Sequence, residues 1–183
     1  FGSNYNLSLF SALTARHSIS SIQTEKNLRR LSETFLSFSA DPDYNISMLT
    51  VALGEMLGAT SCFYTTLDKK KQVYCGACWN LPAGYTMIDN PEGHFGVEFL
   101  EPGKRGITLI LHLEKTAYAQ SEPMVKDLGL KTYFSKIVKL TGQSIGSLSV
   151  VFTRHFVPTH ESEELLRIVA SAISVQESLK MKM

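Results

Sequence analysis

Two cysteines three positions apart are the first candidates for chemistry in this sequence. Cys75 and Cys78 have the spacing of a redox or metal-binding pair. They lie inside a predicted strand, where side chains alternate between faces, so the two thiols could meet only if the strand bulges at Gly76. We expect ordinary strand cysteines and no metal site, since zinc would need about four ligands. Cys62 on the neighbouring strand keeps a redox role open as the alternative.

Five histidines could also carry chemistry. His94 and His112 lie where the rim of a ligand pocket is expected, and either could hydrogen-bond a small molecule or ligate a haem iron. A lone histidine usually does neither. His17, His155 and His160 have no arrangement of nucleophile and base around them, so surface or capping roles are favoured. We predict no catalytic residue in this chain.

Aromatic and small polar side chains give further candidates for a binding pocket. Ser147 and Ser149 alternate with apolar residues, which leaves one face of their strand small and polar. The aromatic candidates, each of which could equally be part of the core, are Tyr64, Trp79, Phe95, Phe99, Tyr118 and Tyr133.

Periodicity predicts the elements that must position these side chains. Apolar residues at helical spacing indicate helices over about 22–38 and 44–57, and a long final helix from about 158. A shorter helix is expected over 121–128, with Ser121 as N-cap. Runs rich in β-branched and aromatic residues predict strands over 60–67, 72–79, 107–111, 132–140 and 144–153. A long connection over 81–106 contains about one helical turn near 95–100. Two hairpins indicate an α+β domain with an antiparallel sheet.

Composition excludes several classes of partner. Lys and Arg total 18 against 17 for Asp and Glu, so no broad positive field favours nucleic acid. No apolar run approaches the roughly 20 residues of a membrane span, so we expect no membrane insertion. Three cysteines favour a reducing compartment and therefore the cytoplasm. The chain begins with Phe1 instead of Met, which suggests a piece of a longer protein.

The closing third resembles the end of a GAF domain. The resemblance is carried by residues 128–134, 146–152, 156–159 and 165–173, and residues 116–123 resemble the segment that leads into the helix before the last hairpin. With the order of elements, it covers roughly residues 22 to 180. It implies a GAF/PAS-like antiparallel sheet of five to six strands in the order 2-1-5-4-3. Helices from the chain ends would cover one face and a loop-covered pocket the other. Residues 1–20 are expected to be a lead-in that resembles a cloning remnant, and residues 21–183 a single domain.

The resemblance also implies a function. GAF domains serve as sensory or regulatory modules of signalling proteins such as bacterial two-component histidine kinases. This chain would bind an unidentified small molecule and relay its state through a homodimer of the terminal helices. The Asn-Lys-Phe-Asp-Glu motif of cyclic-nucleotide-binding members is absent, and no Cys-His pair marks bilin attachment. The residues expected to pair two copies are Leu28, Leu31, Phe35, Leu166, Val169 and Ile173.

Two alternatives remain open. A free-methionine sulfoxide reductase is built on a similar scaffold and would need reactive cysteines that meet at the pocket. A dimerisation spacer that binds no small molecule would instead show a closed, filled pocket.

Overall fold

A computed structural model describes residues 21–68, 70–85, 94–101, 103–104 and 106–182. The chain divides into two compact units, with the boundary between Ser37 and Phe38. The predicted lead-in, residues 1–20, lies outside the described residues. None of the helices in the described ranges is long and apolar enough to cross a membrane.

The first unit contributes a helix over residues 21–36, close to the predicted 22–38. Glu25 and Arg29 form an exposed ion pair one helical turn apart, with 3.7 Å between their charged groups. At the C-terminal end the Ser37 hydroxyl donates to the carbonyl of Thr34 at 2.8 Å. This bond satisfies one of the carbonyls that a helix end leaves without an internal partner.

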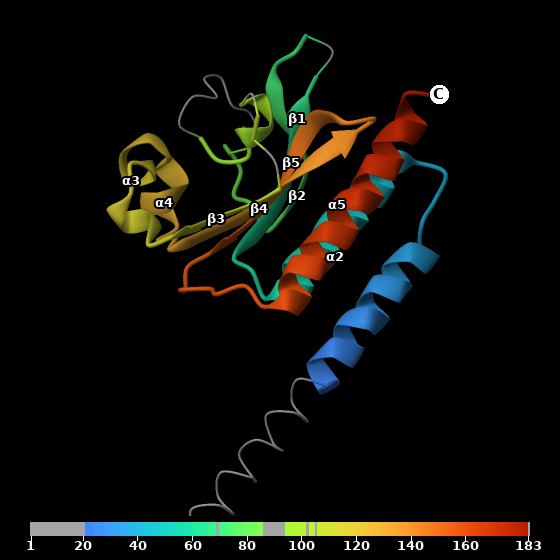
Figure 1. Ribbon diagram of the computed structural model, residues 1–183, viewed down its shortest axis with the longest axis horizontal. Helices are drawn as coiled ribbons and strands as arrows, with labels where there is room; N and C mark the ends of the chain where they lie inside the picture. The colour runs from blue at the N-terminus through green and yellow to red at the C-terminus, as the bar shows by residue number, and fades with distance from the viewer. Residues whose placement is uncertain (1–20, 69, 86–93, 102, 105, 183) are drawn as a thin grey trace, which may run out of the picture. The chain divides into compact units, whose positions relative to one another are not determined.

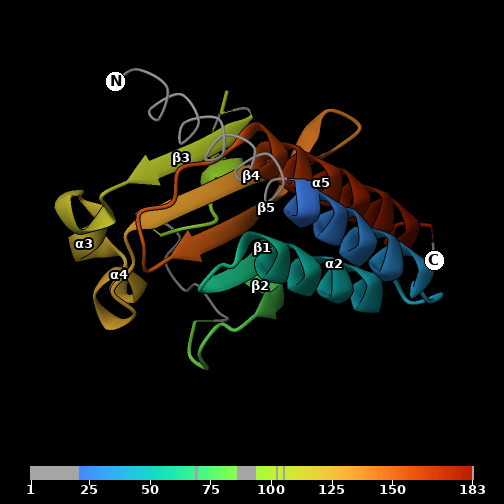
Figure 2. The ribbon, with the colours of Figure 1, turned by 90° about the horizontal axis from the view of Figure 1, so that it is seen from below.

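The second unit is built on a five-stranded antiparallel sheet (Figure 2). Its strands are β1 (Ser61–Leu67), β2 (Val73–Trp79), β3 (Ile107–Leu111), β4 (Thr132–Leu140) and β5 (Gln143–Phe152). They follow the order β2-β1-β5-β4-β3, which confirms the predicted topology. The sheet therefore has β1, β5 and β4 in its interior and β2 and β3 at its edges.

Two long helices pack side by side on one face of this sheet (Figures 1 and 2). They are α2 (Pro42–Leu57) and α5 (His160–Lys180). The side chain of Asp41 caps α2 by accepting from the backbone N–H of Asp43 at 2.9 Å, so the helix begins earlier than the predicted residue 44. Between the helices, the buried Asn45 amide donates to the Gln176 side chain at 2.9 Å, which fixes their relative position.

Short elements cover part of the opposite face. They are η1 (Glu98–Leu100), η2 (Leu113–Lys115), α3 (Tyr118–Ser121) and α4 (Pro123–Asp127). The prediction that Ser121 is an N-cap was wrong. Glu122 takes that position and accepts from the backbone N–H of Met124 at 3.3 Å, because Pro123 occupies the first helical position. The predicted helical turn near 95–100 corresponds to η1.

The contact between α2 and β2 gives a test of the packing on the helix-covered face. A Cβ atom added at Gly54 would overlap the indole ring of Trp79. We expect Gly54→Ala to lower the free energy of unfolding by about 1–3 kcal/mol in urea titration, since overpacking outweighs the gain of about 1 kcal/mol that Ala brings to a helix interior.

The matched background for this prediction is Trp79→Leu. There the indole is absent and Gly54→Ala should be neutral or stabilising. A stabilising effect of Gly54→Ala with Trp79 in place would contradict the packing described.

Candidate functional site

The strand register decides which predicted site residues share a face. Tyr64 of β1 lies opposite Leu148 of β5, and Trp79 of β2 lies opposite Cys62 of β1. Trp79 packs against Gly54 of α2, so Trp79 and Cys62 face the helices, and so does Tyr64, two residues along β1. The structure therefore separates Tyr64 and Trp79 from the other candidates, most of which lie on the loop-covered face.

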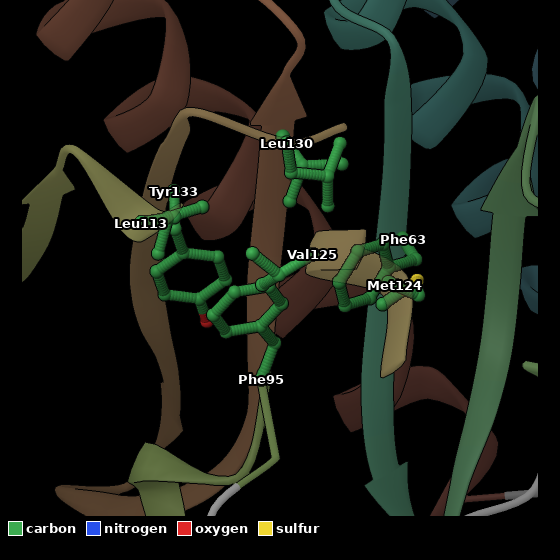
Figure 3. Packing of buried hydrophobic residues seen from close by; sticks show 8 residues of the cluster. Phe63, Phe95, Leu113, Met124, Val125, Leu130 and Tyr133 are labelled. Atoms are coloured by element: carbon green, nitrogen blue, oxygen red, sulfur yellow. The ribbon is translucent and has the colours of Figure 1, made fainter. Parts of the chain in front are cut away.

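A stack of aromatic rings forms the centre of the loop-covered face. Phe95 lies on Tyr133 of β4, with ring centroids 4.4 Å apart and planes inclined by 12°. Phe95 also contacts the half-buried Tyr118 of α3, with centroids 5.0 Å apart and planes inclined by 34°. Figure 3 shows Phe95 and Tyr133 against one another, with Phe63 beside Met124 in the same buried cluster. The stack brings together three of the predicted candidates.

Hydroxyl groups lie beneath this stack, on the sheet itself. The Tyr133 hydroxyl is 2.9 Å from the Ser149 hydroxyl of β5, and it accepts from the backbone N–H of Gly96 at 3.0 Å. The Thr65 hydroxyl of β1 donates to the Gly96 carbonyl. Gly96 has a positive φ of 74°, and a Cβ there would collide with the Thr65 side chain. Only glycine fits this close approach of the loop to the sheet.

Glu98 adds a buried carboxyl group to these hydroxyls. The residue is 1% exposed and begins η1. Its Oε2 accepts from the Ser147 hydroxyl of β5 at 3.3 Å, while Oε1 has no partner among the described residues. Burial raises the pKa of Glu98, and burial together with the nearby Glu98 raises that of Tyr133. We call Thr65, Glu98, Tyr133, Ser147 and Ser149 the polar cluster.

A second buried carboxylate, Glu122, anchors the segment that enters the polar cluster. Its Oε2 accepts from the backbone N–H of Phe95 at 3.0 Å and lies 3.1 Å from Nδ1 of the half-buried His94. The same residue caps α4 through its other oxygen. Glu122 thus holds Phe95 over Tyr133, and His94 acts at the edge of the site as its partner.

The remaining candidates lie at the margins. Phe99 is buried in η1 and, with its neighbours, lines an open groove of about 450 Å³ beside the β4–β5 turn. His112 is exposed and lies apart, next to His155.

The residues not anticipated from sequence are Thr65, Glu98 and Glu122. Glu98 did carry a signal, because it is a lone acid in the apolar run 95–100.

Cys75 and Cys78 do not face opposite sides of the sheet, as they would in a regular strand. The register between β1 and β2 shifts at Gly76, so that Cys75 lies opposite Thr65 and Cys78 opposite Phe63. Both cysteines therefore share the loop-covered face, where the Cys75 thiol donates to the Ala77 carbonyl at 3.1 Å. Burial and the Cys78 thiol raise the pKa of Cys75 to about 12. Cys62 is buried on the other face, where desolvation raises its pKa.

Comparison with solved structures shows that this fold is the GAF fold. The GAF domain of a phosphoenolpyruvate-protein phosphotransferase from Coxiella burnetii gives a TM-score of 0.70 at 14% identity, covering 88% of this chain and 96% of that chain. The phycoerythrobilin-bound GAF domain of a cyanobacterial phytochrome gives 0.62 at 10% identity, covering 87% and 96%. A domain assigned to a two-component sensor histidine kinase of Sinorhizobium meliloti 1021 gives 0.60 at 10% identity, covering 76% and 92%. No protein-family model and no curated protein matches the chain.

The buried carboxyl group predicts a pH dependence of stability. The pKa of Glu98 is higher in the folded protein than in the unfolded chain, so the folded state holds this proton more tightly. Its contribution to stability is complete below the unfolded pKa of about 4.3 and is lost as the pH rises through the folded pKa. Glu98→Gln has no proton to lose at this position, so it avoids this loss of stability. The free energy of unfolding of Glu98→Gln, measured in urea, should therefore increase relative to that of wild type as the pH rises from 4 to 7.

Phe99→Leu is the control, because it alters the neighbouring residue without a titratable group. Its difference from wild type should stay constant over the same pH range. A Glu98→Gln difference that is flat with pH, or that falls as pH rises, would contradict a folded-state pKa of Glu98 that burial raises.

Proposed function

We propose that this chain is a sensory or regulatory GAF domain that binds a small molecule at the polar cluster. The observation that carries the proposal is the buried Oε1 of Glu98, which lacks a partner among the described residues and lies in a group of hydroxyls. An unsatisfied buried polar atom costs free energy, and a ligand that offers a hydrogen-bond donor would remove that cost. The solved structures that resemble this chain include a GAF domain with a bound bilin and a domain assigned to a sensor kinase, which supports the same class.

Access to the polar cluster would require a movement of the segment around Phe95. This ring covers Tyr133, and its backbone is held by Glu122. A ligand that competes for Tyr133 or Glu98 would displace Phe95 and release Gly96 from Thr65 and Tyr133. Binding would thus be linked to a change in the loop, which is what a sensor needs.

The relay we propose is a homodimer through α5. The apolar residues predicted for pairing on this helix, Leu166, Val169 and Ile173, are fully buried in their own domain and cannot face a second copy. A different apolar stripe is exposed on α5, formed by Ile168, Val175 and Leu179 with exposed fractions of 39%, 58% and 43%. These positions are separated by seven and four residues, so they lie along one side of the helix.

Native mass spectrometry of the purified chain, compared with its denatured mass, tests ligand and dimer together. We expect a retained small molecule in the native spectrum, and its occupancy should fall at least tenfold in Glu98→Gln, which lacks the carboxylate acceptor. Spectra in which wild type and Glu98→Gln are equally empty would refute ligand binding at the polar cluster.

The same native mass spectra also show whether the chain is a monomer or a dimer. We expect Ile168→Glu to convert dimer to monomer, because it places a charge in the apolar stripe. Val157→Glu is the matched control, since Val157 is 72% exposed but lies in the loop before α5. A dimer that survives Ile168→Glu, or that Val157→Glu disrupts equally, would move the interface away from α5.

A redox enzyme is the second candidate, and the bulge at Gly76 is the observation in its favour. Reduction of a sulfoxide by two thiols forms one disulfide, one thioether and one water, and Cys75 and Cys78 lie side by side on the loop-covered face. Against it, the pKa of Cys75 at about 12 keeps its thiol protonated and poorly nucleophilic near neutral pH.

An assay with free methionine sulfoxide and dithiothreitol separates the two candidates. We expect wild type to be no faster than Cys78→Ser, because neither protein would use the thiols in turnover. Turnover in wild type that is lost in both Cys75→Ser and Cys78→Ser would overturn the sensory proposal in favour of the enzyme.

A further inference from the structure

Three potential metal ligands from two separate segments meet at one end of the sheet. His112 and Glu114 follow β3, and His155 follows β5. The two imidazole rings have centroids 4.6 Å apart, and Nδ1 of His112 is 3.7 Å from Oε1 of Glu114. One ligand atom from each of the three residues lies within 4.8 Å of the other two.

The segment that carries His155 is held on both sides by one buried threonine. Thr132 begins β4 and pairs with the last residues of β3 and β5. Its hydroxyl donates to the carbonyl of Arg154 at 3.1 Å and accepts from the backbone N–H of Phe156 at 3.0 Å. His155 is therefore fixed between two backbone contacts while its ring stays exposed.

The segment that carries His112 is fixed in a similar way. The backbone N–H of Leu113, whose side chain is fully buried, donates to the carbonyl of Lys131 at 3.1 Å. The His112 carbonyl accepts from the N–H of Lys115 at 2.8 Å, and His112 adopts a left-handed φ of 54°. The backbone around both histidines is hydrogen-bonded to residues at the start of β4. The fold of this end of the sheet therefore brings the two histidines close together.

We propose that His112, Glu114 and His155 bind a divalent transition metal ion, with Zn²⁺ as the expected occupant. Two imidazoles and one carboxylate suit this class of ion, whereas Mg²⁺ and Ca²⁺ prefer oxygen ligands alone. Ligand atoms about 2.0–2.2 Å from a tetrahedral zinc lie roughly 3.3 Å from each other, so the observed separations need only rotation of exposed side chains. A fourth position remains for water.

The charged groups around the proposed metal site, and the position of the site in the fold, affect what a bound ion could do. Glu114 supplies a negative charge, and Lys131 lies close enough to interact with it, so the ion competes with one ammonium group. His155 precedes Thr159, the N-cap of α5, by four residues. A bound ion would link the end of β3 to the segment that leads into α5.

Isothermal titration calorimetry with Zn²⁺ tests the site on the full chain. The Cys75→Ser, Cys78→Ser protein serves as the background, because the paired thiols could otherwise bind zinc themselves. We expect one ion per chain, and an affinity that falls at least tenfold with His112→Ala and with His155→Ala. Co²⁺ added in place of Zn²⁺ should give visible absorption bands of a nitrogen and oxygen site that both variants lose.

His160→Ala is the matched control, because His160 is exposed at the start of α5 but is not part of the cluster. It should bind Zn²⁺ like the background protein. Circular dichroism checks that each variant is folded, and Glu114→Gln, which keeps the shape of its side chain, should also weaken binding. Equal Zn²⁺ affinity in the background, His112→Ala and His155→Ala proteins would overturn the proposal, as would an absence of binding in the background protein.

Discussion

The close approach of the Gly96 backbone to β1 and β4 holds the loop-covered face together. Buried backbone groups must find partners, and Gly96 finds both on side chains of the sheet, its N–H on Tyr133 and its carbonyl on Thr65. The contact is too close for any side chain at this position. Because Gly96 is fixed, its neighbour Phe95 lies flat on Tyr133, and the Glu98 carboxyl group reaches the Ser147 hydroxyl of β5.

The two faces of the sheet differ in how many polar side chains they bury. The helix-covered face buries apolar side chains such as Leu148, Val150 and Val169, which is the usual way for a sheet to gain stability. The other face buries Glu98 and several hydroxyls, although apolar residues there would avoid the cost of dehydrating a carboxyl group. A fold that needed this face only for packing would gain by replacing them. Ligand binding, as proposed above, would give these polar groups a role that packing does not require.

Sequence patterns predicted the elements well, because helical and strand periodicities are local properties of the chain. They could not assign faces reliably. Cys75 and Cys78 would lie on opposite faces of a regular strand, and one extra residue at Gly76 places both on the same face. Tyr64 was likewise expected at the pocket and instead faces the helices. The face on which it lies depends on the strand register, which the sequence does not reveal. Glu98 was missed because its burial requires partners from β5, far along the chain.

Strand β5 connects the features on which a sensory role would depend. Its middle carries Ser147 and Ser149, which contact Glu98 and Tyr133, and its end continues through His155 to the cap of α5. A strand is nearly inextensible, so a displacement at its serines must be absorbed by neighbouring strands or passed along the chain. The hydroxyl of Thr132 holds the residues on both sides of His155, which limits where that displacement can go. The chain that leaves β5 leads directly into α5, the helix that carries the exposed apolar stripe of the proposed homodimer.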